Sequence, residues 1–217
     1  MRQAFQEELD HLQHQVNQLF DLTEQSFVKV HQVLATDDIA LAEQILAEDA
    51  EINQTQLAIE VAAAHLIARQ QPVAKDLRQI VSWMQISSDL EKIGDYSALM
   101  AKCLLNLQGH ARSTDLEGAL LDLGQQAHHL CSLVRSLVNH QKEQELQVVT
   151  QLEEALVEKR KSLSATVRRR MDRETDLVLS GTYYLSIALH MERMADYLTN
   201  ICERLVYIET GRLQEKA

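Results

Sequence analysis

Two pairs of acidic residues with the same spacing occur 101 residues apart in this chain of 217 residues. Glu91 and Asp95 form the first pair, and Glu192 and Asp196 form the second. Each glutamate is followed by a basic residue and each aspartate by a tyrosine. Residues four apart lie on one face of a helix, so each pair projects two carboxylates in the same direction. The recurrence indicates an internal duplication, with an equivalent carboxylate pair in each half.

Two carboxylates at this spacing repel one another by about 0.2–0.5 kcal/mol in an isolated helix, so a compensating cation is expected nearby. A metal ion is one candidate, because hard cations prefer oxygen ligands and two carboxylates one turn apart can reach the same ion. The basic neighbours Lys92 and Arg193 are the other, through ion pairs with a neighbouring helix. Spacing leaves both interpretations open, and the duplication favours the metal.

Further oxygen ligands occur in the helix that precedes each pair. Asp49 and Asn53 are four apart in the first half, and Glu154 and Glu158 in the second, where the adjacent Glu153 leaves the register ambiguous. If these rows face the acidic pairs, each half contains a patch of four oxygen-bearing side chains. The candidate metal ligands are therefore Glu91, Asp95, Asp49, Asn53, Glu192, Asp196, Glu154 and Glu158.

Six long helices must position these side chains. Apolar residues at alternating steps of three and four, together with turn residues, predict helices ending near Ala35 and over about 39–68, 73–107, 115–138, 143–171 and 174–209. Pro72 is expected in the first turn of the third helix, and Gly211 ends the last. Short connections favour antiparallel neighbours. We therefore predict an all-α fold of two tandem three-helix bundles, residues 1–108 and 109–217, packed side by side.

The composition supports a helical protein and excludes several functions. There is one Pro and six Gly, and 46% of the residues are apolar. The net charge of −11 argues against nucleic acid as a partner and suits cations or basic protein surfaces. The three cysteines lack the spacing of a disulfide framework or a zinc site. With no signal-peptide core or spanning segment, the sequence predicts a cytoplasmic protein. It contains no nucleophile elbow, phosphate-binding glycine loop or Cys/His pairing.

The motifs resemble those of the PhoU family of phosphate-signalling regulators. The resemblance rests on Pro72-Val73-Ala74-Lys75-Asp76-Leu77-Arg78, on the two Glu-basic-x-x-Asp repeats, on Asp49 with Ile52-Asn53, and on the closing segment 206–211. It implies a cytoplasmic regulator without enzymatic activity, which couples the nucleotide-binding subunit of a phosphate ABC transporter to a membrane sensor histidine kinase and represses the phosphate-starvation response. It also implies a homodimer that reaches the membrane through its partners only, and metal ions such as iron, zinc, manganese or magnesium at the carboxylate motifs.

Two other functions remain as alternatives. One is a metal-dependent enzyme or metal store of the helical-bundle carboxylate class, although the Glu-x-x-His pairs of di-iron bundles are missing. The other is an accessory protein of a low-affinity phosphate transporter. The Pro-Val-Ala-x-Asp-Leu-Arg segment favours the phosphate-signalling regulator over this accessory protein.

Overall fold

The computed structural model describes residues 2–140 and 146–212, and in these ranges the chain is almost entirely helical, with no strand. A short 3-10 helix, η2 (Thr175–Leu177), precedes the last of the six α-helices. The α-helices are α1 (Arg2–Thr36), α2 (Ile39–Gln70), α3 (Ala74–Asn106), α4 (Thr114–His140), α5 (Leu146–Met171) and α6 (Val178–Thr210). The predicted all-α fold is confirmed.

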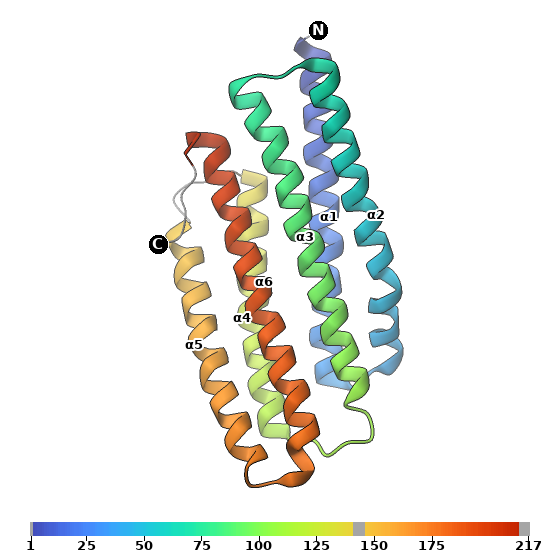
Figure 1. Cartoon of the computed structure of the whole chain (residues 1–217), viewed down its shortest axis with the longest axis vertical. Helices are drawn as coiled ribbons and strands as arrows, with labels where there is room; N and C mark the ends of the chain where they lie inside the picture. Colours follow the sequence, from blue (N-terminus) through green and yellow to red (C-terminus); the bar gives the residue numbers. More distant parts are fainter. Residues whose placement is uncertain (1, 141–145, 213–217) are drawn as a thin grey trace.

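The helices form two bundles of three (Figure 1). Helices α1, α2 and α3 pack around one another in the first bundle, and α4, α5 and α6 in the second. The bundles are joined along their length, chiefly by α3 against α6, which run antiparallel through the middle of the molecule (Figure 1). Helices α1 and α4 add a second contact. The prediction of tandem bundles packed side by side is confirmed.

The buried face of α2 recurs in α5 with a constant shift. Ile45, Ile52, Ile59 and Ala63 of α2 are buried, and the buried Val149, Leu156, Leu163 and Val167 of α5 follow each of them by 104 residues. The buried faces of the two helices therefore have the same geometry. This correspondence identifies equivalent positions in the two repeats, including those outside the core.

Helix ends follow the predicted turn chemistry with two differences. Asp38 caps α2 by accepting a hydrogen bond from the Leu41 amide at 3.1 Å, and Gly211 ends α6 with a φ of 72°. Helix α3, however, begins at Ala74, so that Pro72 lies before it and not in its first turn, because Gln71 adopts a left-handed conformation (φ 47°) and Val73 is extended. Helix α6 begins after η2. The predicted start of the fifth helix at 143 lies outside the described residues.

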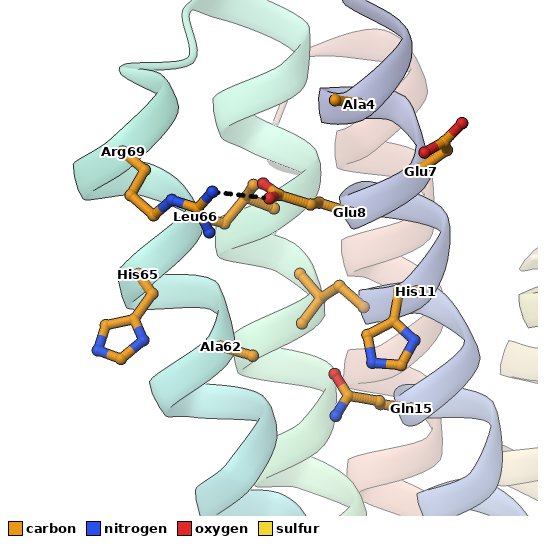
Figure 2. A pocket seen from close by; sticks show the side chains of 10 residues that line it. Ala4, Glu7, Glu8, His11, Gln15, Ala62, His65, Leu66 and Arg69 are labelled. Carbon is orange, nitrogen blue, oxygen red and sulfur yellow. Dashed lines mark ion pairs between the residues drawn. The ribbon is translucent and has the colours of Figure 1, made fainter. Parts of the chain in front are cut away.

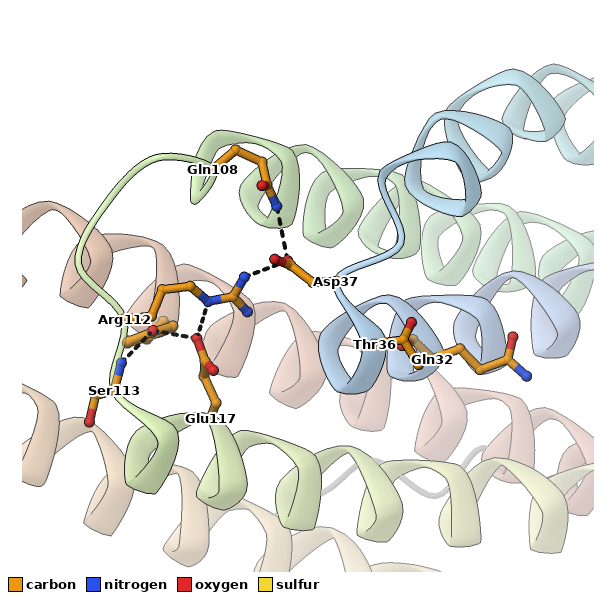
Figure 3. Close-up of polar contacts among 8 residues, drawn as sticks. Gln32, Thr36, Asp37, Gln108, Arg112, Ser113 and Glu117 are labelled. Atoms are coloured by element: carbon orange, nitrogen blue, oxygen red, sulfur yellow. Dashed lines mark hydrogen bonds and ion pairs between the residues drawn. The ribbon is translucent and has the colours of Figure 1, made fainter.

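A cluster of polar contacts fastens the connection between the bundles (Figure 3). Arg112, in this connection, donates to Asp37 in the α1–α2 turn and, at 2.5 Å, to Glu117 in the first turn of α4. The buried Tyr184 of α6 also donates to Glu117, at 2.6 Å. Burial, together with this hydrogen bond, raises the pKa of Tyr184 to about 12. Arg112 thus links a turn of the first bundle to α4 of the second, and Glu117 in turn is bound by Tyr184 of α6.

Replacing Arg112 with Ala should lower the free energy of unfolding by about 1–3 kcal/mol, because the largely buried Glu117 loses its cationic partner. Urea unfolding followed by circular dichroism measures the change. Arg169→Ala is the control, since this exposed arginine donates a hydrogen bond to the Thr166 hydroxyl on its own helix and its loss should cost less than about 0.5 kcal/mol. Equal effects of the two substitutions would contradict the linking role of Arg112.

Candidate functional site

The first acidic patch lies between α2 and α3. Asp49 and Asn53 are one turn apart on α2, and the Asn53 amide approaches an Asp49 carboxylate oxygen at 3.4 Å. The other oxygen of Asp49 is buried and has no hydrogen-bond partner. Burial raises the pKa of Asp49, and the negative charge of Asp95 on α3 raises it further. The charge of Asp95 on α3 is thus felt by Asp49 on α2 in this half.

A glycine allows the two helices to approach at this point. A Cβ atom added to Gly94 would lie 3.0 Å from a methyl carbon of Ile52, which is tighter than ordinary van der Waals contact. Gly94 precedes Asp95, and Ile52 follows Asp49 by one turn of α2. The missing side chain at Gly94 thus brings the two aspartates toward each other. The equivalent residue of the second repeat is the larger Ala195.

Lys92 supplies a positive charge to the pair on its own helix. Its ammonium group lies 3.0 Å from a carboxylate oxygen of Glu91 and 3.0 Å from one of Asp95. Hydrogen bonds to these carboxylates raise the pKa of Lys92 well above its usual value. An ion pair with a neighbouring helix was one alternative that the sequence left open, but both printed partners of Lys92 lie on its own helix, α3.

The second patch contains a basic residue between its helices. Arg160 of α5 binds Glu192 of α6 through two hydrogen bonds, one of them at 2.9 Å, and both side chains are mostly buried. Arg193 lies 3.3 Å from Asp196 on the same helix. This two-point contact is the geometry in which a guanidinium binds a carboxylate most strongly. Arg160 therefore neutralises Glu192 across the helix interface, in contrast to the first patch.

The structure resolves the register of α5. Glu153 follows Asp49 by 104 residues, the shift that relates the two cores, and it is buried, with 6% of its surface exposed. It accepts a hydrogen bond from Thr199 of α6 at 3.3 Å. Glu154 and Glu158 are exposed, and Glu158 pairs with Lys161 of α5 at 2.7 Å. Glu153 is thus the equivalent of Asp49, and aligning the buried residues of the two repeats would have identified it.

The two motifs meet where α3 packs against α6. Tyr96 and Tyr197 follow Asp95 and Asp196 in sequence, and their ring centroids are 6.0 Å apart. His190 stacks on Tyr96 with the centroids 5.5 Å apart, and its Nδ1 is buried without a hydrogen-bond partner. Burial lowers the pKa of His190. This aromatic contact places the two acidic patches on opposite sides of one helix pair.

A groove of about 480 Å³ lies between α1 and α2, away from the acidic patches. Figure 2 shows Arg69 of α2 paired with Glu8 of α1, at 3.2 Å, above His11 and His65 on the two walls. The groove has an apolar floor that includes Leu12 and Leu66. It contains residue types that bind metals, but its polar side chains do not converge on one point.

Among residues 2–140 and 146–212, no three His, Cys, Asp or Glu side chains are grouped so that they could hold a metal ion. The first patch depends on the amide of Asn53 in addition to its carboxylates. None of the described helices contains a stretch apolar and long enough to cross a membrane.

Known proteins resemble this chain along its whole length. The family model for the PhoU domain matches twice, over residues 16–104 and 120–205. The chain is 38% identical over 214 residues to the phosphate-specific transport system accessory protein PhoU homolog of Streptococcus pneumoniae serotype 4, and the match covers 98% of both chains. It is 27% identical over 208 residues to the homolog of Rhizobium meliloti, covering 96% of this chain and 88% of that one.

Solved structures share the fold. The crystal structure of the phosphate transport system regulatory protein PhoU from Streptococcus pneumoniae matches with a TM-score of 0.90 and 33% identity, covering 98% of this chain and 100% of that one. The structure of PhoU from Pseudomonas aeruginosa matches with a TM-score of 0.91, covering 96% and 100%. Its 23% identity supports the likeness of fold alone.

Replacing Arg160 with Met should lower the free energy of unfolding by about 1–3 kcal/mol, since Glu192 keeps its charge in a mostly buried position. The matched control is Lys161→Met, which removes an exposed pair from the adjacent position and should cost about 0.5 kcal/mol or less. Chemical unfolding of both variants gives the comparison. A wild-type stability for the Arg160 variant would rule out a structural ion pair in the second patch.

Proposed function

The chain belongs to the PhoU family, and on this premise we propose that it is a cytoplasmic regulator of phosphate uptake and phosphate-starvation signalling. It acts by binding two proteins, the nucleotide-binding subunit of a phosphate ABC transporter and a membrane sensor histidine kinase. When phosphate is plentiful, these contacts repress the phosphate regulon. The observation that carries the proposal is the 38% identity, over nearly the full length of both chains, to a protein named as an accessory of phosphate-specific transport.

The distribution of charge supports a role in protein binding. One acidic motif lies on α3 and the other on α6. The side chains of Lys92 and Arg193, which belong to these motifs, are 44% and 56% exposed. Alternating charges on an exposed helix face favour one binding orientation of a partner over others. The net charge of −11 suits basic surfaces on such partners. The proposal also includes a homodimer that reaches the membrane only through its protein partners.

We place the metal-binding function in the first repeat. The buried, unpartnered oxygen of Asp49 and the carboxylate of Asp95 leave negative charge at the α2–α3 interface, which a hard cation could neutralise. Asn53 and Glu91 complete the ligand set there. In the second repeat Arg160 already neutralises Glu192, and Glu154 and Glu158 are exposed, so the geometry favours the first patch. A bound ion would strengthen the contact between α2 and α3.

A metal-dependent enzyme or metal store and an accessory protein of a low-affinity phosphate transporter are the competing functions. The first is disfavoured because the sequence lacks the two Glu-x-x-His motifs with which helical-bundle carboxylate proteins bind two metal ions. The second shares the helical repeat. The names of the relatives favour the high-affinity system, since they refer to phosphate-specific transport.

Deleting the gene from its native host should derepress phosphate-starvation genes in phosphate-rich medium. The physical reason is the loss of the contacts that hold the sensor kinase in its repressing state. Transcript levels with and without a plasmid copy of the gene provide the measurement. An unchanged response to phosphate in the deletion strain would refute the proposed regulation.

The double substitution Glu91→Ala, Asp95→Ala should reduce the metal content of the purified protein while leaving its helicity unchanged, because the two side chains are partly exposed ligands and not core residues. Elemental analysis and far-ultraviolet circular dichroism measure the two quantities. Glu154→Ala, Glu158→Ala is the matched control, since it removes two carboxylates with the same spacing from an exposed face. Unchanged metal content in the first variant, or a wild-type protein without metal, would contradict the assignment.

A further inference from the structure

The outer side of helix α2 is apolar and exposed to solvent. Helix α2 packs on α1 and α3 and lies at the outer edge of the first bundle (Figure 1). Its exposed residues include Leu57 and Val61, with 58% and 47% of their surfaces exposed. An outer helix normally places polar side chains toward water. We call the exposed row the α2 stripe, which consists of Ala47, Ala50, Gln54, Leu57, Val61, Ala64 and Ala68.

The second repeat shows that the fold does not require this apolar face. Helix α5 occupies the equivalent place in the second bundle, and its buried residues match those of α2 with a shift of 104 residues. The positions equivalent to the first six of the α2 stripe are also exposed, but they are mainly polar or charged: Gln151, Glu154, Glu158, Lys161, Ala165 and Arg168. The apolar character therefore belongs to α2 and not to the fold.

The charge around the α2 stripe is negative. Residues 39–68 include five acidic side chains and no Lys or Arg. Glu51 and Glu60 are exposed, and their positions along the helix place them on opposite flanks of the stripe. Glu43 is exposed on the same face, one turn before the stripe begins. Helix α5 has the opposite balance, with six basic and three acidic residues.

This combination of charge and apolar surface defines the chemistry of a fitting partner. An apolar row between carboxylates complements an amphipathic helix whose own apolar row lies between Lys and Arg side chains. The same charges disfavour other occupants. A second copy of α2 would bring its own carboxylates toward Glu51 and Glu60, and like charges across an interface oppose binding. An anionic membrane surface would be repelled for the same reason.

The sizes of the side chains indicate how such a helix would pack. The residues of the α2 stripe alternate steps of three and four, the spacing at which two helices pack nearly parallel or antiparallel along their length. Leu57 and Val61 lie in the middle of the stripe, and alanines lie toward both of its ends. Apolar anchors near the centre of an interface commonly supply most of its binding energy. The alanines leave room for larger apolar side chains of the partner.

We propose that the α2 stripe is the docking site for a basic amphipathic helix of another protein. This deepens the proposed function and rests on it, because it gives one of the regulator's protein contacts a defined face. The stripe covers residues 47–68 and is about 33 Å long. Interfaces that bury less than about 1,200 Å² in total are typically weak. A single helix docked on this row belongs to that class, so the contact is reversible, as a regulatory contact must be.

The binding test uses the purified full-length chain and a fluorescein-labelled synthetic helix of leucine and lysine, about as long as residues 47–68. Its fluorescence anisotropy should rise to saturation with the wild type. Leu57→Lys, Val61→Lys should weaken binding by about tenfold or more without loss of helicity, because both side chains are exposed in the free chain. Val148→Lys, Ala165→Lys is the control, since it adds the same charge to exposed positions of α5 and should bind more tightly than the α2 variant. A wild type that does not bind, or equal weakening in both variants, would overturn the inference.

A second pair of variants separates the flanking charges from the net charge of the chain. Glu51→Gln, Glu60→Gln should weaken binding of the same synthetic helix by about threefold or more and make it less sensitive to salt. Glu154→Gln, Glu158→Gln removes two carboxylates from the exposed face of α5 and should leave the affinity near that of the wild type. Equal losses would show that the probe responds to the whole acidic chain, which would contradict a site on α2.

A test in the native host connects the α2 stripe with regulation. A chromosomal Leu57→Lys, Val61→Lys variant, present at the wild-type protein level, should derepress phosphate-starvation genes in phosphate-rich medium as the gene deletion does. Val148→Lys, Ala165→Lys should keep them repressed. Normal repression in the α2 variant, together with derepression in the deletion strain, would overturn the inference and leave the proposed function in place. An unchanged deletion strain would instead refute the proposed function, and the binding test would still decide whether α2 takes a basic helix.

Discussion

The antiparallel packing of α3 against α6 determines where the functional side chains of this protein lie. The two helices carry equivalent motifs, so their contact brings Tyr96 against Tyr197 and joins the two bundles near the centre of the molecule. Each acidic pair then faces outward, toward α2 in one repeat and α5 in the other. Each motif keeps a partly exposed basic residue on its own side of the helix pair, Lys92 in one repeat and Arg193 in the other. The arrangement therefore suits recognition of a surface better than enclosure of a small substrate.

The two repeats neutralise their acidic side chains in different ways. In the first, Lys92 bridges Glu91 and Asp95 from the same helix, and Asp49 keeps an unpartnered oxygen beside them. In the second, Arg160 of α5 binds Glu192 of α6 directly. A guanidinium that forms two hydrogen bonds is harder to displace than an exposed ammonium. The first repeat thus keeps negative charge that a bound cation could neutralise. In the second repeat, Arg160 already neutralises Glu192.

The outer helices of the two repeats, α2 and α5, share their buried positions but differ in their solvent-facing residues. The buried faces of α2 and α5 kept one pattern, because each must fill the same space in a three-helix core. The core does not constrain their solvent-facing residues. At equivalent exposed positions α5 is mainly polar or charged and α2 is mainly apolar. Charged residues such as Glu158 and Lys161 keep α5 solvated, whereas Leu57 and Val61 leave α2 with exposed apolar surface. One repeat therefore offers a face suited to a partner, and the other does not.

The sequence by itself determined the six helices, the duplication and the composition of the acidic motifs, because helical periodicity, caps such as Asp38 and the spacing of Glu91 and Asp95 are local properties. It also led to the family through the segment that begins at Pro72. Only the tertiary structure decided which charges meet. The register of α5 against α6 selected Glu153 and Arg160 over Glu154 and Glu158, and the direction of the Lys92 side chain depended on its surroundings. Those outcomes depend on contacts between helices distant in sequence, which the packing of whole cores fixes.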